Sequence, residues 1–133
     1  MDVSGDGGVL LETKSPGAGP SPKQGQVVFA HYTGTLPDGQ VFDSSVGKPH
    51  RVDGFYFALG EGCVIRGWDV GFANMKVGEK ATLTIRADYA YGERGGGGIP
   101  GGATLVFEVE LLEARDMSGE EIKEQDRTVA SLW

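Results

Sequence analysis

A run of glycines is the first stretch of this sequence whose spacing suggests chemistry. Residues 91–102 read "YGERGGGGIPGG" and contain a formal G-x-G-x-x-G at Gly96, Gly98 and Gly101. That motif binds a nucleotide pyrophosphate only between a strand and a helix, because the helix N-terminus supplies the amide donors. The next residues, "ATLVFEVEL", alternate as a strand does, and no Gly-Lys-Ser/Thr ends the run. We therefore expect a glycine loop beside a site, not a nucleotide-binding loop.

Metal and nucleophile chemistry have few candidate residues. The two histidines, His31 and His50, are far apart in the sequence and show neither H-x-x-x-H nor H-E-x-x-H spacing. The single cysteine, Cys63, excludes an internal disulfide and a C-x-x-C site. No G-x-S-x-G motif is present. The sequence thus predicts a protein without a metal, a cofactor or a covalent nucleophile.

Aromatic residues are more numerous than candidate metal ligands or nucleophiles, and several lie beside turns or carboxylates in the sequence. Phe42 precedes Asp43, Trp68 precedes Asp69, and Tyr91 precedes the glycine run. Most large apolar side chains in a domain of this size form the core. These three aromatic residues instead favour an apolar pocket with a few polar groups at its edge, which is the usual composition of a small-molecule site.

Length and composition indicate one globular domain of 133 residues with ordinary hydrophobic (39%) and charged (23%) fractions. The net charge of −7 argues against nucleic acid as a partner, because a nucleic-acid surface needs a basic stripe. The opening residues "MDVSGDGGVL" lack the basic and apolar regions of a secretory signal, and no run approaches the ~18 apolar residues of a membrane span. We expect no membrane partner and a cytoplasmic or nuclear location.

Alternation of apolar and polar residues predicts several β-strands. The pattern begins in "VLLETK", resumes from Gln26 and continues after a "PDG" turn at 37–39. Further strand patterns follow in "FYFALG", "ATLTIRA" and "ATLVFEVELLEA". Because no β-α-β alternation occurs, we expect an α+β fold in which an antiparallel sheet of about five or six strands wraps around one short helix.

Helical spacing occurs once among these strands. In "VIRGWDVGFANM" an apolar stripe recurs at helical intervals and consists of Ile65, Trp68, Phe72 and Met75. Gly67 and Gly71 within it are poor helix formers, each costing up to ~1 kcal/mol relative to alanine. This helix therefore needs tertiary packing to persist.

The two ends of the chain are predicted to lie outside a domain that spans residues 9–115. Residues 1–8 are expected to be a flexible N-terminal tail because they are rich in glycine. Residues 116–133 are expected to form a C-terminal helical extension, since Ser118 and Glu121 make a capping box. Two interpretations of this extension stay open: a solvated tail helix, or a linker helix that leads to a following domain.

Five blocks, in this order and spacing, closely resemble the FKBP family, the macrolide-binding peptidyl-prolyl isomerases. They read "VFAHYTGTLPDGQVFDSS", "FALGEGCVIRGWDVG", "KVGEKATLTI", "DYAYGERG" and "IPGGATLVFEVELLE". The resemblance covers roughly residues 9–114 and implies a half-barrel antiparallel sheet curled around one short helix. It also implies cis/trans isomerisation of X-Pro bonds in peptides and proteins without a cofactor, and binding of rapamycin and tacrolimus in the same apolar pocket.

The resemblance also assigns residues to this pocket. It implies that the proline ring packs on Trp68, whose indole must then face a hollow large enough for a ligand. The Tyr91 hydroxyl and the Ile65 N–H are the implied donors to ligand carbonyls. The implied catalytic residues are Tyr32, Phe42, Asp43, Trp68, Tyr91 and Phe107. The remaining substrate- and macrolide-binding residues are Phe55, Val64, Ile65 and Ile99.

The sequence departs from the family pattern at two places near the implied site. The stretch "VGKPHRVDGFYF" is longer than in many members, and "GGGG" stands where a bulkier loop tip is common. The glycine departure bears on peptide selectivity and on partner recruitment by a bound macrolide. Because of the longer stretch, the assignment of Phe55 as a pocket wall depends on the register of the following "FALG". The alternative function is a non-enzymatic, proline-directed docking or co-chaperone module of a larger assembly, with a further protein partner at residues 116–133.

Overall fold

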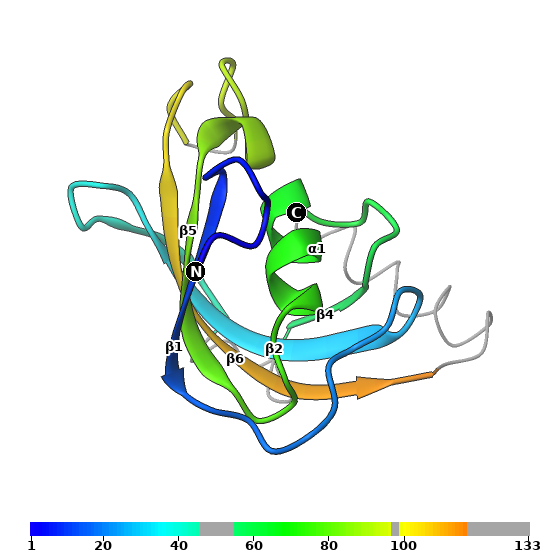
Figure 1. Cartoon of the computed structure of the whole chain (residues 1–133). Coiled ribbons are helices and arrows are strands. Elements are labelled where there is room, and N and C mark those ends of the chain that lie inside the picture. The colour runs from blue at the N-terminus through cyan, green and yellow to red at the C-terminus, as the bar shows by residue number, and fades with distance from the viewer. Residues whose placement is uncertain (46–54, 97–98, 117–133) are drawn as a thin grey trace.

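The computed structural model describes residues 1–45, 55–96 and 99–116. Its main feature is one antiparallel six-stranded sheet that bends around α1, the one α-helix of the described residues (Figure 1). The strands are β1 (Val9–Ser15), β2 (Val27–Thr35), β3 (Val41–Ser44), β4 (Phe55–Ala58), β5 (Lys80–Ile85) and β6 (Leu105–Arg115). They pair in the order β1-β5-β6-β2-β3, and β4 pairs with β2. The predicted α+β class and antiparallel sheet are confirmed.

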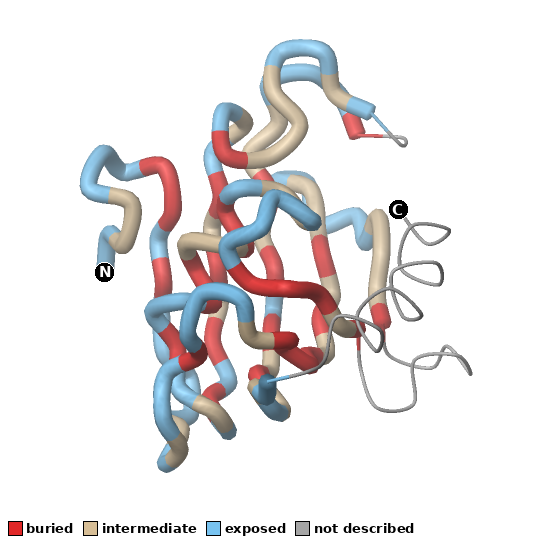
Figure 2. The backbone as a smooth tube through the Cα atoms, turned by 90° about the vertical axis from the view of Figure 1, so that its right-hand side faces the viewer, coloured by how far each residue is buried: buried red, intermediate tan, exposed pale blue. Residues whose placement is uncertain are grey.

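Strand β6 illustrates how the alternating pattern separates the two faces of the sheet. Its apolar residues, from Leu105 through Phe107 and Val109 to Leu111, are buried in the core, whereas Glu108 between them is exposed. The facing strand β5 follows the same rule. In Figure 2 the buried segments lie in the body of the molecule, and the loops that project from it are mostly exposed or half-buried. Burial of one face fixes the register of each strand, because a slip by one residue would turn every apolar side chain to water.

Helix α1 (Arg66–Ala73) lies on the concave face of the sheet (Figure 1). The predicted stripe extends beyond both of its ends, since Ile65 is the N-cap residue and Met75 follows the C-cap. Trp68, Phe72 and Met75 are fully buried, and Ile65 is half-buried. The stripe was thus identified correctly as the buried side of a short helix.

The two helix glycines allow α1 to lie directly against β5. A Cβ atom at Gly67 would lie 2.5 Å from Cγ2 of Ile85, and one at Gly71 would lie 2.8 Å from Cδ1 of Leu83. Both separations are shorter than real Cβ contacts. The close packing on β5 requires glycine at both positions and supplies the tertiary support that their low helix propensity demands.

Residues 1–8 fold back against β1, although their glycines favoured a flexible tail. Asp2 forms an isolated antiparallel bridge with Leu10. The Asp2 carboxylate accepts hydrogen bonds from the backbone amides of Gly5 (3.1 Å) and Gly7 (2.8 Å). These local side-chain-to-backbone bonds order the glycine-rich segment.

A second anchor ties the same N-terminal turn to the end of β5. The Asp6 carboxylate accepts a hydrogen bond from the Tyr89 hydroxyl at 3.0 Å and lies 3.3 Å from Nη2 of Arg86. Tyr89 belongs to a short 3-10 helix, Ala87–Tyr89, which follows β5. The N-terminal turn is therefore fixed at both of its carboxylates.

The predicted helical extension at 116–133 lies outside the described residues except for Asp116, where the described chain ends. Strand β6 runs to Arg115. Within the described part of the chain, no helix has the length and apolar character needed to cross a bilayer.

Candidate functional site

The buried half of the predicted site is a cluster of aromatic rings around Trp68 of α1. The centroid of its indole lies 4.8 Å from Tyr32 of β2, 5.8 Å from Phe55 of β4 and 5.3 Å from Phe107 of β6. The interplanar angles of 73°, 78° and 80° correspond to the edge-to-face arrangement that aromatic pairs prefer. Each ring comes from a different element, so the curvature of the sheet around α1 assembles the cluster.

A carboxylate from β3 adds a polar group to this aromatic cluster. The Tyr32 hydroxyl donates a hydrogen bond of 2.6 Å to Oδ2 of Asp43, and Oδ1 of Asp43 accepts the Ser44 amide at 2.8 Å. The Tyr32 side chain is buried, so its phenol needs this partner, whereas Asp43 is half-buried. The hydrogen bond fixes the carboxylate at the edge of the cluster.

Phe42 joins the site through a glycine of the neighbouring strand. Its ring lies 5.5 Å from Phe107 at an interplanar angle of 82°. A Cβ atom at Gly34 of β2 would lie 2.5 Å from Cζ of Phe42 and 2.8 Å from Cε1 of Phe107. Any larger residue at Gly34 would push the two rings apart, so this glycine permits the contact.

Tyr91 brings a hydroxyl to the site from the turn that follows the 3-10 helix. The side chain is half-buried, and within the described residues its hydroxyl makes no hydrogen bond. Burial raises the pKa of the Tyr91 phenol, and the nearby negative charge of Asp43 raises this pKa further. The phenol therefore stays protonated at neutral pH and keeps a hydrogen to donate.

Val64 and Ile65 immediately precede α1 and are both half-buried. The Ile65 carbonyl accepts the Trp68 amide at 2.9 Å, which starts the first helical turn. The Ile65 N–H makes no hydrogen bond to any part of the chain that the structure describes. Like the Tyr91 hydroxyl, the Ile65 N–H is therefore a donor of the site that has no acceptor among the described residues.

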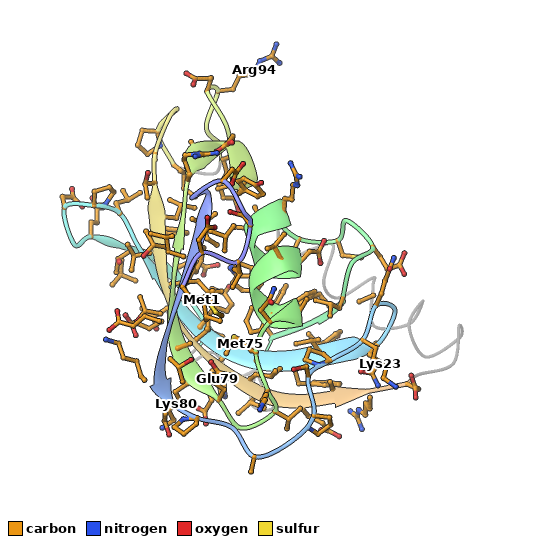
Figure 3. The ribbon with its side chains drawn as sticks, viewed as in Figure 1. Met1, Lys23, Met75, Glu79, Lys80 and Arg94 are labelled. Atoms are coloured by element: carbon orange, nitrogen blue, oxygen red, sulfur yellow. The ribbon has the colours of Figure 1, made fainter. Side chains whose placement is uncertain are left out.

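Ile99 is the contribution of the glycine loop, residues 92–102. Its side chain is buried in the hydrophobic core, and its backbone exchanges two hydrogen bonds with Gly96, at 2.9 and 3.0 Å. A Cβ atom at Gly96 would lie 3.9 Å from Cδ1 of Tyr91, so the loop passes beside the Tyr91 ring. Figure 3 shows Arg94 at the far tip of this loop, with its side chain directed away from the body of the molecule.

The exposure of Trp68 differs from the prediction. The resemblance implied an indole that faces a ligand-sized hollow, but the Trp68 side chain is 0% exposed. Phe57 and Phe72, at 5.7 and 5.4 Å, pack on it in addition to the predicted rings. Solvent meets only the less buried part of the predicted site. We call this part the half-buried group; it consists of Phe42, Asp43, Val64, Ile65 and Tyr91.

Two polar residues support the site in ways that the sequence did not predict: Ser45 was not singled out, and Asp69 was noted only as the neighbour of Trp68. Oγ of buried Ser45 accepts the Tyr32 amide at 2.8 Å and lies 3.0 Å from Nδ1 of His31. The carboxylate of Asp69, in the first turn of α1, accepts the Gly60 amide at 2.8 Å. Neither residue is part of a periodic sequence pattern, so the pattern analysis gave no signal for their contacts. For Asp69, the available signal was an acid within reach of a loop with two glycines.

A shallow depression of about 320 Å³ lies on the other face of the sheet. It is lined by charged residues of both signs, including Lys14, Lys80, Glu108 and Glu110, and Tyr32 is the one predicted site residue that borders it. The depression is therefore distinct from the aromatic site. Among the residues that the structure describes, no group of histidine, cysteine and acidic side chains could hold a metal ion.

Comparisons with known proteins agree on one family. The family model for the FKBP-type peptidyl-prolyl cis-trans isomerase matches residues 19–112. FK506-binding protein 1 of Candida glabrata is 54% identical over 115 residues, which cover 85% of this chain and 98% of that protein. FK506-binding protein 1 of Saccharomyces cerevisiae is 54% identical over 110 residues, covering 81% and 94%.

A longer relative and a solved structure complete the comparison. FK506-binding protein 59 of Drosophila melanogaster is 46% identical over 133 residues, which cover 97% of this chain and 30% of that protein. The crystal structure of a peptidyl-prolyl cis-trans isomerase from Pseudomonas syringae superimposes with a TM-score of 0.72 at 38% identity, covering 84% of this chain and 77% of that one.

Proposed function

The chain belongs to the FKBP-type peptidyl-prolyl cis-trans isomerase family, and from this premise we propose that it isomerises X-Pro bonds at the aromatic site and binds rapamycin and tacrolimus there. The domain that does so is proposed to span residues 9–115, in the cytoplasm or nucleus. The proposed contacts with the prolyl ring come from the aromatic cluster, and the proposed contacts with flanking carbonyls come from the half-buried group.

The reaction suits a site that has no nucleophile. Rotation about a peptide bond faces a barrier of ~18–20 kcal/mol, because resonance gives the C–N bond partial double-bond character. For an X-Pro bond the two isomers differ by only ~1 kcal/mol, yet they exchange over tens to hundreds of seconds. A catalyst therefore needs only to favour the twisted amide over both planar forms. No proton has to be transferred.

An apolar aromatic site favours the twisted amide for an electrostatic reason. The twisted bond has lost its resonance, so its carbonyl is less polar and loses less on leaving water. A differential stabilisation of ~5–7 kcal/mol would accelerate the reaction by ~10⁴–10⁵-fold. Rings from β2, β4, β6 and α1 make such an environment at Trp68.

The observation that carries the proposal is a pair of donors without protein acceptors beside this cluster. Within the described residues, the Tyr91 hydroxyl and the Ile65 N–H make no hydrogen bond. Both belong to the half-buried group, where a peptide can reach them. They would hold the carbonyls on either side of the proline, so that the chain bends into a turn while the central amide rotates.

The complete burial of Trp68 determines how a ligand would enter. A prolyl ring would first pack against the half-buried group. Contact with the indole then requires a covering side chain to turn aside. Side-chain rearrangements of this kind are common when a ligand binds a site whose backbone is preformed.

The activity is tested by protease-free NMR exchange spectroscopy on a peptide that contains a Leu-Pro bond. Micromolar protein should accelerate the cis/trans exchange well above the rate in buffer. The matched control is Glu108→Gln, because Glu108 lies next to Phe107 on β6 but is exposed on the other face. Exchange no faster than in buffer, with folding confirmed by circular dichroism, would refute the proposed activity.

Macrolide binding is tested by titration with rapamycin and with tacrolimus, followed by tryptophan fluorescence. Because the chain has two tryptophans, Trp68 and Trp133, the titration is done in a Trp133→Phe background. We expect a saturable change in Trp68 emission. An unchanged spectrum together with no binding heat in calorimetry would show that the macrolide site lies elsewhere or is absent.

A further inference from the structure

The segment that carries one of the two donors is hydrogen-bonded to the rest of the chain at both of its ends. Residues 59–65 connect β4 to α1 and include Val64 and Ile65. At the start, the Leu59 amide donates to the Gln26 carbonyl at 2.9 Å. At the end, the Ile65 carbonyl accepts the first amides of α1. Contacts of the middle of the segment also influence how the Ile65 N–H is presented.

The middle of this segment is bonded to the Asp69 carboxylate. Oδ1 of Asp69 accepts the Gly60 amide at 2.8 Å, and the Gly62 amide also favours the ionised carboxylate. Gly60 and Gly62 have φ values of +76° and +73°, which are in the left-handed region that favours glycine. With these conformations the chain turns so that both amides serve one side chain.

Asp69 does not serve its own helix in this way. The N-cap residue of α1 is Ile65, and the cap makes no side-chain hydrogen bond. The Asp69 carboxylate instead accepts amides from outside the helix, at Gly60 and Gly62. Burial raises the pKa of this carboxyl, while the Gly60 and Gly62 amides oppose that change. A half-buried acid is thus retained where it costs solvation, which fits a role as an oxygen acceptor that an apolar residue would not perform.

We propose that Asp69 is a positioning residue that holds residues 59–65 so that the Ile65 N–H and the Val64 side chain face the ligand correctly. This inference rests on the proposed function of the aromatic site. Asp69 itself touches no reacting atom and acts through the Gly60 and Gly62 amides. Because the Ile65 N–H would hold a flanking carbonyl in the planar and twisted forms alike, loss of Asp69 should weaken binding more than it slows turnover.

The experiment compares Asp69→Ala and Asp69→Asn with the wild-type chain. In Asp69→Ala we expect KM for the Leu-Pro peptide to rise about fivefold or more while kcat stays within about twofold. Asp69→Asn keeps an oxygen acceptor for Gly60, so its KM should return to within about twofold of the wild-type value. Backbone amide resonances of Gly60, Gly62 and Ile65 should shift in Asp69→Ala in ¹⁵N-resolved NMR spectra. This spectral readout does not depend on activity.

The matched control is Asp2→Ala. Asp2 also accepts backbone amides from glycines of a turn, but its partners, Gly5 and Gly7, lie in the N-terminal segment, which holds no predicted site residue. This variant should lower the melting temperature without changing KM. If Asp69→Ala fails to fold, Asp69→Ser replaces it, because serine is polar but too short to reach Gly60.

The inference is overturned if the alanine variant keeps the wild-type KM, if the asparagine variant is as impaired as alanine, or if the Ile65 amide resonance does not move. These outcomes are separate from failure of the proposed function. A wild-type chain that neither accelerates exchange nor binds rapamycin refutes the function itself. An active wild type with an unchanged Asp69→Ala variant refutes only the role of Asp69.

Discussion

Neighbouring residues of β6 belong to two chemically different surfaces. Phe107 packs against Trp68 on the concave side, whereas Glu108 is exposed and borders the depression on the outer side together with Lys14 and Lys80. The outer face therefore has a shallow hollow, and the concave face has the aromatic rings and two donors without an acceptor among the described residues. The volume of a hollow alone does not identify the functional site. A mostly apolar ligand needs apolar contacts and a few hydrogen-bond donors.

The largest expected difference between the two faces of β6 is in the free energy of unfolding. Phe107→Ala should lower the free energy of unfolding by about 3–5 kcal/mol, because it removes a buried ring and leaves a cavity. Glu108→Ala should change this free energy by no more than about 0.5 kcal/mol, since Glu108 is exposed and its hydrogen bond with the Thr82 hydroxyl is exposed as well. Urea denaturation of both variants measures the difference. Similar midpoints for the two would mean that β6 is not divided in this way.

Substitutions on the two faces should also differ in their effect on ligand affinity, but by less free energy than in the stability test. Trp68→Ala should weaken rapamycin binding by more than ~1.5 kcal/mol, because the ring that packs on the ligand is lost. Lys80→Ala, on the outer face, should leave the affinity unchanged. Calorimetry on variants shown to be folded provides the comparison. Equal affinity of Trp68→Ala and the wild type would place the macrolide away from α1.

Removal of the Tyr91 hydroxyl, one of the two donors of the half-buried group, should have a more modest effect on catalysis. Tyr91→Phe keeps the ring and removes one neutral hydrogen bond of about 0.5–1.5 kcal/mol, so kcat/KM should fall by roughly 2–10-fold. Thr82→Val removes a hydroxyl that donates to Glu108 on the outer face and should leave kcat/KM unchanged. NMR exchange rates measure both. A full effect from Thr82→Val would contradict the assignment of catalysis to the concave face.

The smallest effect concerns acid stability, which we expect to involve groups outside the concave face. Hydrogen bonds from the Ser4 hydroxyl and the Gly8 amide, aided by Tyr89 and Arg86, lower the pKa of Asp6 from 3.8 to about 2. A carboxyl with a lowered folded-state pKa stabilises the fold above its ordinary pKa, and this contribution is lost as the pH falls toward 2. Melting temperatures between pH 5 and about pH 2 should fall less in Asp6→Asn than in the wild type. Identical slopes would show that Asp6 makes no net contribution.

The regular elements were predictable because their signals are periodic. The alternation in β5 and β6 follows from one buried face, and the stripe through Trp68 and Phe72 follows from the turn of a helix. The tertiary contact that makes Gly67 and Gly71 acceptable was only implied, since their partners Ile85 and Leu83 lie on β5. Periodicity identifies which side is buried but not what it packs against.

The site was predicted less completely, for physical reasons that differ between residues. The structure brings the predicted aromatic residues together, but Phe57 and Phe72, which carried no site signal, also pack on Trp68. The N-terminal turn was missed because Asp2 stabilises it through backbone amides, and glycine content alone indicates the opposite. Contacts between a side chain and a nearby backbone leave no repeat in the sequence.

The glycine contacts between α1 and β5 have one more consequence. With Ile85 and Leu83 lying where Cβ atoms of the helix would otherwise be, α1 has little freedom to roll on the strand. The orientation of the indole is thereby set by the volume of two strand side chains. Under the proposed function, substitutions at Ile85 or Leu83 would alter ligand affinity from positions that touch no ligand.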